Sequence, residues 1–251
     1  MSLSAFWMMS SNVGDNITPY ILKKVTGKDP VYAQGGADYE HYVFAGSILN
    51  HANAKSMVWG AGIATWTDSI SVGARLMAVR GPISRNRAVS LGIRCPHIYG
   101  DPGILLPKFY FPHVEKTHDV GIVPHYTDQF RADAWYPEGR IINVLQPVED
   151  FVREILSCRK IVSSSLHGII IAHAYGIPAT WVRISDSIGG DGTKYVDYYG
   201  SVNMDITEPV DLRDKHDLPS VPDTLPDLQL MRDRLWNACP IPVTMRRPEY
   251  L

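Results

Sequence analysis

Lys160-Ile-Val-Ser-Ser-Ser-Leu-His-Gly-Ile169 is the segment that best indicates the fold, because a strand-like run passes directly into a helix-like one. The β-branched Ile161 and Val162 favour a buried strand, and three serines follow it. A helix is expected to begin at Leu166 and to end before Gly176. A strand that leads into a helix through a short polar turn is typical of parallel α/β proteins.

The same alternation extends over both sides of this segment. Strands are expected at Phe6–Met9, Tyr42–Ala45, Ser56–Gly60, Leu76–Arg80, His97–Asp101, Asp119–Pro124, Arg140–Val144, Lys160–Ser163 and Ala179–Ile184. Helices are expected at Ile17–Thr26, Pro82–Leu91, Pro147–Cys158, Leu166–Tyr175 and around Leu228–Ala238. The proline- and aspartate-rich stretch from Pro209 to Pro226 is expected to be irregular.

Pro107–His118 has two prolines and three aromatic residues, and it is the best candidate for a linker. We therefore expect an α/β protein of two Rossmann-like halves, residues 1–112 and 113–251. The halves would face each other across a cleft at the carboxyl ends of both sheets.

Composition excludes several classes of function. The 251 residues carry 24 basic and 26 acidic side chains, so no net basic charge favours nucleic acid. Three cysteines without a CxxC pair indicate neither a disulfide framework nor a zinc site, and the histidines lack metal-binding spacing. No apolar run reaches the roughly 18 residues of a membrane span, and the start lacks the basic region of a signal peptide. We expect a cytoplasmic protein that binds no metal.

The turn between the strand and helix of the opening segment is suited to an anion. Unpaired N–H groups and a positive partial charge gather in the first turn of a helix. Ser163, Ser164 and Ser165 add hydroxyl donors there, and Gly168 would let a ligand approach the backbone. His167 lies in the same turn, and histidine is a residue type that can both donate and accept a proton, which suits proton transfer. The alternative is that a serine caps the helix and His167 is structural.

Two arginines lie at a second strand-to-helix turn. Arg80 is expected at the carboxyl end of a strand and Arg85 in the first turn of the next helix. A guanidinium binds carboxylate or phosphate through two parallel hydrogen bonds. Arg85 could instead be a solvated charge of the helix face.

Other polar residues follow predicted strands and are candidates for the same cleft. Asn12 and Asp15 lie in a turn after the first strand that suits the cap of the next helix, and capping alone could account for Asp15 or Asn16. Asp101 is a candidate base, hydroxyl acceptor or turn former. His125 ends the first strand of the second half. Lys194 follows a glycine-rich stretch that lacks phosphate-loop spacing, so we expect a flexible loop with Lys194 as a possible contact.

Several of these segments together resemble the polysaccharide pyruvyl transferase family, in order over roughly residues 10 to 200. The matching pieces are Asn12-Val-Gly-Asp15, Val58-Trp-Gly-Ala-Gly62, Val79-Arg-Gly-Pro82 with Ser84, Gly100-Asp-Pro-Gly-Ile-Leu-Leu-Pro107, Gly121-Ile-Val-Pro-His125, Ser163-Ser-Ser-Leu-His-Gly168 and Ala172-His-Ala-Tyr-Gly-Ile-Pro178. The resemblance implies a two-domain arrangement like that of glycosyltransferase-B enzymes, with the site between the halves.

The resemblance also implies transfer of a carboxyethylidene group from phosphoenolpyruvate to two hydroxyls of one sugar, forming a pyruvate ketal. No cofactor besides this donor substrate is expected. His167 is our candidate general acid, and Asp101, Asp15 or His125 our candidate base. Many family members have an arginine where this chain has Ser165. Arg80, Arg85 or Lys194 would then have to bind the donor in its place.

Two other classes of function stay open. One is a glycosyltransferase with a nucleotide-sugar donor on the same kind of fold, and the other is a non-catalytic carbohydrate-binding relative. The expected partner is a sugar or a lipid-linked oligosaccharide, with peripheral contact if that acceptor is membrane-bound. No nucleic acid partner is expected.

Overall fold

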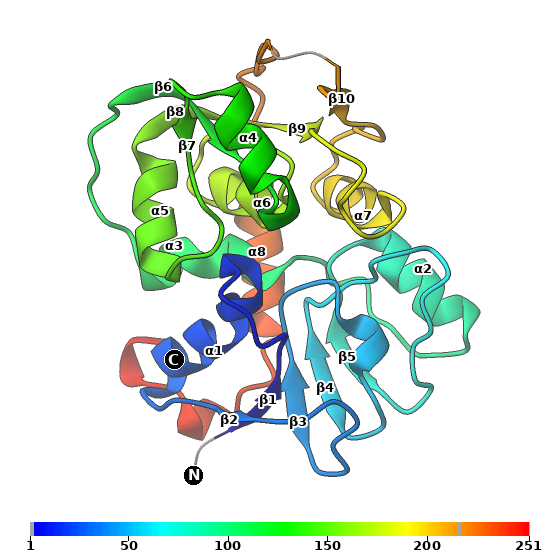
Figure 1. Cartoon of the computed structure of the whole chain (residues 1–251). Helices are drawn as coiled ribbons and strands as arrows, with labels where there is room; N and C mark the ends of the chain where they lie inside the picture. Colours follow the sequence, from blue (N-terminus) through cyan, green and yellow to red (C-terminus); the bar gives the residue numbers. More distant parts are fainter. Residues whose placement is uncertain (1–2, 215–216, 251) are drawn as a thin grey trace.

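Two parallel sheets of five strands each make up the framework, in a computed structural model that describes residues 3–214 and 217–250. The first sheet has the order β2-β1-β3-β4-β5 and the second the order β10-β9-β8-β6-β7. Figure 1 shows the second sheet above the first, with α1 on one side of the junction and α7 stacked over α2 on the other. The α/β prediction with parallel sheets is confirmed.

The described elements have the following bounds. The strands are β1 (Ser4–Phe6), β2 (Val31–Tyr32), β3 (His41–Val43), β4 (Ser56–Trp59), β5 (Arg75–Ala78), β6 (His118–Val123), β7 (Arg140–Ile141), β8 (Cys158–Ser163), β9 (Ala179–Arg183) and β10 (Val210–Asp211). The helices are α1 (Val13–Thr26), α2 (Pro82–Ser90), α3 (Leu106–Phe109), α4 (Gln129–Trp135), α5 (Val148–Leu156), α6 (Leu166–Ala174), α7 (Thr193–Ser201) and α8 (Gln229–Asn237). No helix among these is long and apolar enough to cross a bilayer.

Local sequence signals account for these helix ends, although α1 begins at Val13 and not at Ile17 as predicted. The Asn12 side chain accepts a hydrogen bond from the Gly14 N–H and so caps α1. Gly27 ends that helix in the left-handed conformation, at φ 72°. Pro82 begins α2, where its missing N–H costs nothing. Each of these helices therefore begins or ends at a residue whose chemistry suits that position.

Two predicted features differ from the structure. His97–Asp101 forms no strand and contributes one isolated bridge, between Val79 and Tyr99, because Pro102 follows directly and cannot donate to a ladder. The predicted loop 189–194 ends at Gly192, and α7 begins at Thr193. The tyrosines and β-branched residues of α7 are weak helix formers, so its packing against α2 decides the helix.

Both sheets share one strand order. Numbered within its own half, each reads 2-1-3-4-5, the order of flavodoxin-like doubly wound sheets. In such sheets the chain leaves the first strand in one direction and the third in the other. The crevice at the carboxyl ends of those two strands is where ligands bind. The topology thus places one candidate site beyond β1 and β3, and another beyond β6 and β8.

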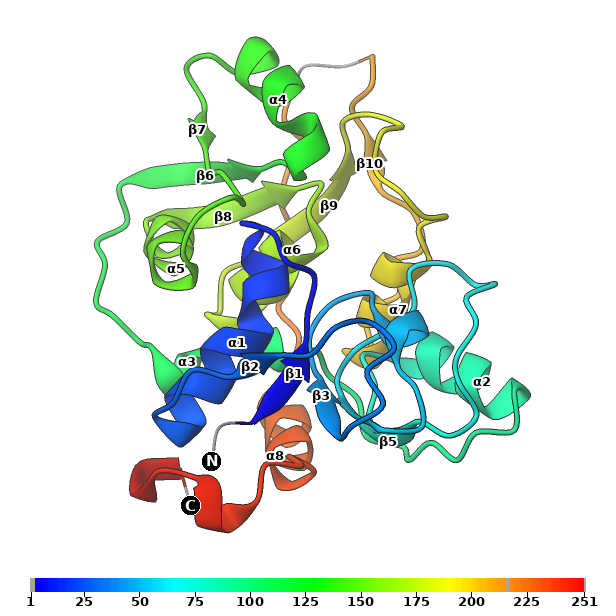
Figure 2. The same cartoon turned by 60° about the horizontal axis from the view of Figure 1, so that its bottom comes forward.

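The two halves exchange elements. The chain passes from the first sheet to the second between α3 and β6, within the predicted linker. Helix α1 belongs to the first half but contacts α5 of the second. Helix α8 returns to the first half, where the Leu235 carbonyl accepts a hydrogen bond of 2.8 Å from Trp59 Nε1. Figure 2 shows α8 beneath β1. These contacts between the halves fix the position of one sheet relative to the other.

Candidate functional site

The two switch points face the same pocket, which has a volume of about 350 Å³. Its walls come from the segments that follow β1, β3, β6 and β8, with additions from Leu145 and α7. We call it the switch-point pocket. It is lined by Met8, Met9, Ser10, Asn12, Asp15, Gly46, Ser47, Ile48, His125, Tyr126, Leu145, Ser165, Leu166, His167 and Lys194. Because both crevices open into it, this pocket is the candidate site.

Six of the residues predicted from the sequence line this pocket, and they come from both halves of the chain. These are Asn12, Asp15, His125, Ser165, His167 and Lys194. Six others lie outside its lining: Arg80, Arg85, Asp101, Ser163, Ser164 and Gly168. The reasons differ from residue to residue, and they follow from the hydrogen bonds and packing of each.

His167 is held from two sides. Its Nε2 lies 3.4 Å from Asp101 Oδ2, and the carboxylate is fully buried while the imidazole is 13% exposed. Gly14 lies against the other side of the ring: a Cβ there would come within 2.0 Å of His167 Nδ1. The first turn of α1 thus forms a wall against which the imidazole packs, and only glycine leaves room for it.

Asp101 supports His167 from below and does not reach the pocket. It caps the turn after it by accepting a 2.9 Å hydrogen bond from the Gly103 N–H. Burial alone would raise the pKa of this carboxyl, but His167, the Gly103 N–H and Arg80 hold the pKa below its ordinary value. Asp101 is therefore an anion that faces the histidine. This placement suits a positioning residue better than a base for a sugar hydroxyl.

Asp15 and His125, the other two candidate bases, do line the pocket. Burial raises the pKa of Asp15, against opposing effects of a hydrogen bond from Ser10 and the charge of His167. Burial and the nearby Lys194 lower the pKa of His125 to about 4, with Asp128 opposing them. His125 is consequently a neutral imidazole at neutral pH, and it is able to accept a proton.

Lys194 is the one lysine or arginine among the residues that line the switch-point pocket. Burial lowers its pKa to about 8, and the positive charge of Arg80 adds to the effect. The lysine also lies across from the N-terminus of α6. Ser165 makes no side-chain cap there, so the helix end faces the pocket uncapped. Together they are the candidate site for an anion.

Arg80 lies beneath the pocket in a buried ion pair. Its Nε is 3.1 Å from Asp197 Oδ2, and both side chains are completely buried. Its other nitrogens donate to Ser47 Oγ at 2.8 Å and to the Ile63 carbonyl. Arg80 thus reaches the pocket only through Ser47. Arg80 therefore serves to join the end of β5 to α7, and this structural role accounts for an arginine at the end of the strand.

Arg85, in the first part of α2, is absent from the lining of the pocket. It lies near Cys95, whose thiol pKa is raised to about 11 by burial and lowered in part by the arginine. The structure therefore leaves Lys194, out of the three cations proposed from the sequence, as the one that faces the site.

The three serines have separate tasks. Ser163 donates to the carbonyls of Val123 and Ser165, and Ser164 donates to Asp128 Oδ2 at 2.7 Å. Both are completely buried, so their hydroxyls brace the turn. Ser165 alone faces the pocket.

Gly168 also has an internal role. A Cβ at this position would lie 2.4 Å from Ser163 Oγ, so the glycine permits close packing of α6 on the strands. The backbone space that we expected to admit a ligand is filled by the protein itself.

Three residues that sequence reasoning missed shape the site. Gly14 admits the His167 ring, Ser47 links the pocket to Arg80, and Asp197 receives Arg80 from α7. Gly14 lies inside the Asn12–Asp15 motif, where a glycine in a helix is a signal in itself because it costs helix stability. Asp197 carried no such signal, since its helix was not predicted.

The fold and the pocket define a doubly wound α/β protein with a candidate anion site and an imidazole–carboxylate pair between its two sheets. A family model described as "Polysaccharide pyruvyl transferase" matches residues 7–186 of the chain. The protein belongs to the polysaccharide pyruvyl transferase family, as the sequence motifs indicate.

An uncharacterized protein of Acanthamoeba polyphaga mimivirus is 31% identical over an alignment of 207 residues. That alignment covers 77% of this chain and 71% of the viral protein. No solved structure matches. Membership of the family places the protein among the pyruvyl transferases.

Proposed function

We propose that the protein transfers a carboxyethylidene group from phosphoenolpyruvate to two hydroxyls of one sugar, in a polysaccharide or its precursor, and releases phosphate. The observation that supports this most directly is the switch-point pocket itself. It combines a cation, an uncapped helix N-terminus and a histidine backed by a buried carboxylate. An enol phosphate with its own carboxylate needs two anion-binding groups and a proton donor within reach of one carbon.

The donor would lie with one anionic group on Lys194 and the other on the first turn of α6. Ser165 Oγ is at that turn and offers a further donor. Lys194 then does the work of an arginine at position 165, because it enters the same pocket from α7. Arg80 holds Ser47 and α7 in place, so it supports donor binding indirectly.

The reaction begins with protonation of the donor's methylene carbon, which becomes a methyl group and leaves an oxocarbenium-like centre at C2. One sugar hydroxyl forms a C–O bond to C2, the bond from C2 to the phosphate oxygen breaks, and the second hydroxyl forms the other C–O bond. Two protons leave the hydroxyls. One replaces the proton given to the methylene carbon, and the other ends on the released phosphate.

His167 is the proposed acid. Its Nδ1 packs against Gly14, and its Nε2 lies 3.4 Å from Asp101 Oδ2, so we assign the transferred proton to Nε2. His125 is the proposed base of the two candidates that line the pocket, because its ring is neutral at neutral pH while Asp15 lies next to His167 and faces its charge. Asp15, next to His167, would then balance the charge of the protonated ring.

The arrangement of the two sheets around this pocket agrees with a glycosyltransferase-B-like protein, and we include that architecture in the proposal. A cytoplasmic location follows from the same proposal, because phosphoenolpyruvate is a cytosolic metabolite. The acceptor would be a sugar or a lipid-linked oligosaccharide.

Thermal unfolding with phosphoenolpyruvate, with UDP and with buffer alone tests the donor. A ligand at 100 times its Kd stabilises a protein by about 2.7 kcal/mol, so a shift with phosphoenolpyruvate alone is the expected result. A shift with UDP alone would indicate a nucleotide-sugar glycosyltransferase. No shift with either would indicate a non-catalytic relative.

His167→Ala tests the acid. With an acceptor in hand, phosphate release should slow by at least ~10²-fold, while stabilisation by phosphoenolpyruvate persists. His113→Ala, at an exposed histidine outside the pocket, is the matched control. Turnover near that of the wild type in His167→Ala would exclude proton transfer by this residue.

A further inference from the structure

A second pocket of about 460 Å³ adjoins the first and shares Lys194 with it. It lies where β9 ends, under the loop that leads to α7, and we call it the loop pocket. Its lining includes Trp181, the loop residues 188–192 and, from the chain beyond α7, Thr207, Glu208 and Pro209. We propose that the loop pocket binds the neutral sugar that receives the pyruvyl group. This inference rests on the proposed function for the identity of the donor beside it.

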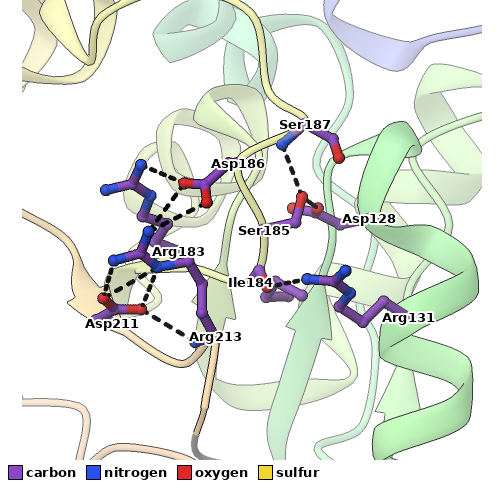
Figure 3. A network of polar contacts seen from close by, with 9 residues as sticks. All are labelled: Asp128, Arg131, Arg183, Ile184, Ser185, Asp186, Ser187, Asp211 and Arg213. Carbon is purple, nitrogen blue, oxygen red and sulfur yellow. Dashed lines mark hydrogen bonds and ion pairs between the residues drawn. The ribbon is translucent and has the colours of Figure 1, made fainter.

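Charge separates the two pockets. The loop pocket has two carboxylates that face no cation in the lining, Asp191 and Glu208. Its arginine, Arg183, pairs with Asp186. Figure 3 shows Asp186 also bound by Arg213, which in turn holds Asp211 on β10. The arginines at this edge are thus already paired, and Lys194, which lines both pockets, is the cation that remains for the donor.

The helix end at this pocket is occupied as well. Helix α7 begins in the loop pocket, and Asp191 Oδ1 accepts a 3.0 Å hydrogen bond from the Thr193 N–H of its first turn. The protein's own carboxylate therefore fills the position that a phosphate would take. This differs from α6, whose uncapped N-terminus faces the switch-point pocket.

What the loop pocket does offer suits a sugar. Trp181 lies in its wall, with Tyr195 stacked on the indole at 4.3 Å between ring centroids and an angle of 11°. Glu208 is exposed, and no described residue bonds its carboxylate. An apolar wall with a few hydrogen-bonding groups is the usual make-up of a small-molecule site. A carboxylate that lacks a partner is able to accept bonds from hydroxyls.

Trp66 extends this surface from the other half of the protein. Its backbone N–H donates a 3.1 Å hydrogen bond to Asp191 Oδ2, and its side chain is 53% exposed. A large indole left open next to the loop provides an apolar face on which the ring of a sugar can rest. The loop pocket thus draws on both halves of the chain, as the switch-point pocket does.

Lys194 lines both pockets, so its position determines how a sugar in the loop pocket would lie relative to the donor. A sugar in the loop pocket would approach the donor from the α7 side, and His125 lies close enough to Lys194 for the lysine's charge to affect it. Two hydroxyls at the inner edge of the sugar would then meet the donor carbon next to the proposed base.

Saturation-transfer NMR with methyl glycosides of glucose, galactose and mannose tests the proposal on the full chain. At least one glycoside should receive saturation from the wild type. Glu208→Gln should weaken that glycoside's binding by about tenfold, because a charged acceptor of hydrogen bonds is lost. Trp66→Ala should weaken it several-fold. Both side chains are exposed, so neither change should alter Tm.

Matched controls are Glu115→Gln and Phe111→Ala, at exposed positions outside both pockets, and neither should alter glycoside binding. Equal binding to Glu208→Gln and Glu115→Gln would overturn the proposal, as would the absence of saturation for every glycoside. Displacement of a bound glycoside by inorganic phosphate would show an anion site instead.

Stabilisation by phosphoenolpyruvate is measured on the same variants and should stay unchanged. The measurement with phosphoenolpyruvate distinguishes failure of the proposed sugar site from failure of the proposed donor. If glycosides bind with the expected dependence on Glu208 while phosphoenolpyruvate has no effect on the wild type, the sugar site stands and the pyruvyl donor falls.

Discussion

The protonation of Lys194 should make the affinity of the donor site dependent on pH. Its pKa of about 8 means that the ammonium loses its proton just above neutral pH, because burial first and Arg80 second disfavour the charge. A bound anion favours the charged lysine, so donor affinity is highest below pH 8. We expect the affinity for phosphoenolpyruvate to fall as the pH rises through this value, by up to about tenfold for each further pH unit.

Calorimetric titration at several pH values on either side of pKa 8 measures this effect. Lys194→Arg should bind the donor with little change over the same range, since a guanidinium keeps its charge. Lys194→Met should weaken binding below pH 8 and abolish the dependence. An equally steep fall in Lys194→Arg would assign the titration to another group.

At the scale of elements, the first turn of α1 is the wall against which the His167 imidazole packs. Gly14 is the position where this wall and His167 meet, since a Cβ would reach within 2.0 Å of the ring. Gly14→Ala should therefore displace the ring from its present position between α1 and Asp101. A misplacement of about 1 Å is able to cost on the order of 10²-fold in turnover.

Stability should respond less than turnover, because alanine favours a helix over glycine by about 1 kcal/mol and offsets part of the clash. Steady-state kinetics and urea unfolding of the same variant separate the two effects. Gly35→Ala is the control, since a Cβ there would meet only Phe6, at 3.7 Å. Full activity in Gly14→Ala would show that the ring position tolerates the shift.

Across the whole molecule, one buried ion pair joins the two halves. Arg80 follows β5 of the first sheet and Asp197 lies on α7, after the strands of the second. Ser84 donates to both oxygens of Asp197, through its N–H and its hydroxyl. Asp197→Ala would leave the Arg80 charge buried without a partner, and we expect a loss of about 3 to 5 kcal/mol in the free energy of unfolding.

Denaturation in urea checks this expectation. Asp211→Ala, in the exposed network of Figure 3, is the contrasting control and should leave the midpoint unchanged because solvent screens its charges. The double variant Arg80→Met/Asp197→Leu should lose less than its two single changes together. Fully additive losses would mean that the pair does not act as a unit.

The same contacts predict a single unfolding transition. Trp59 belongs to the first sheet and bonds α8, while Trp181 belongs to the second. Since helices cross between the halves, probes near each tryptophan should report one midpoint. Separate midpoints would show that the halves unfold independently.

Local sequence determined a large part of this protein. Strands and helices with clear apolar runs and end signals, such as the end of α1 at Gly27, were predictable because their causes lie within a few residues. The family was recognisable from the order of short motifs. Residues that follow strands were sound candidates for the site, because parallel strands bring their carboxyl ends to one edge.

Only the tertiary structure decided which candidates reach the pocket. Ser163, Ser164 and Ser165 are identical in sequence terms, yet two brace the turn and one faces the site. In the sequence, Arg80 has the features of an anion-binding residue. In the structure its guanidinium is paired with Asp197, 117 positions away. Partners at such separations are set by how the sheets pack, and no local pattern carries that information.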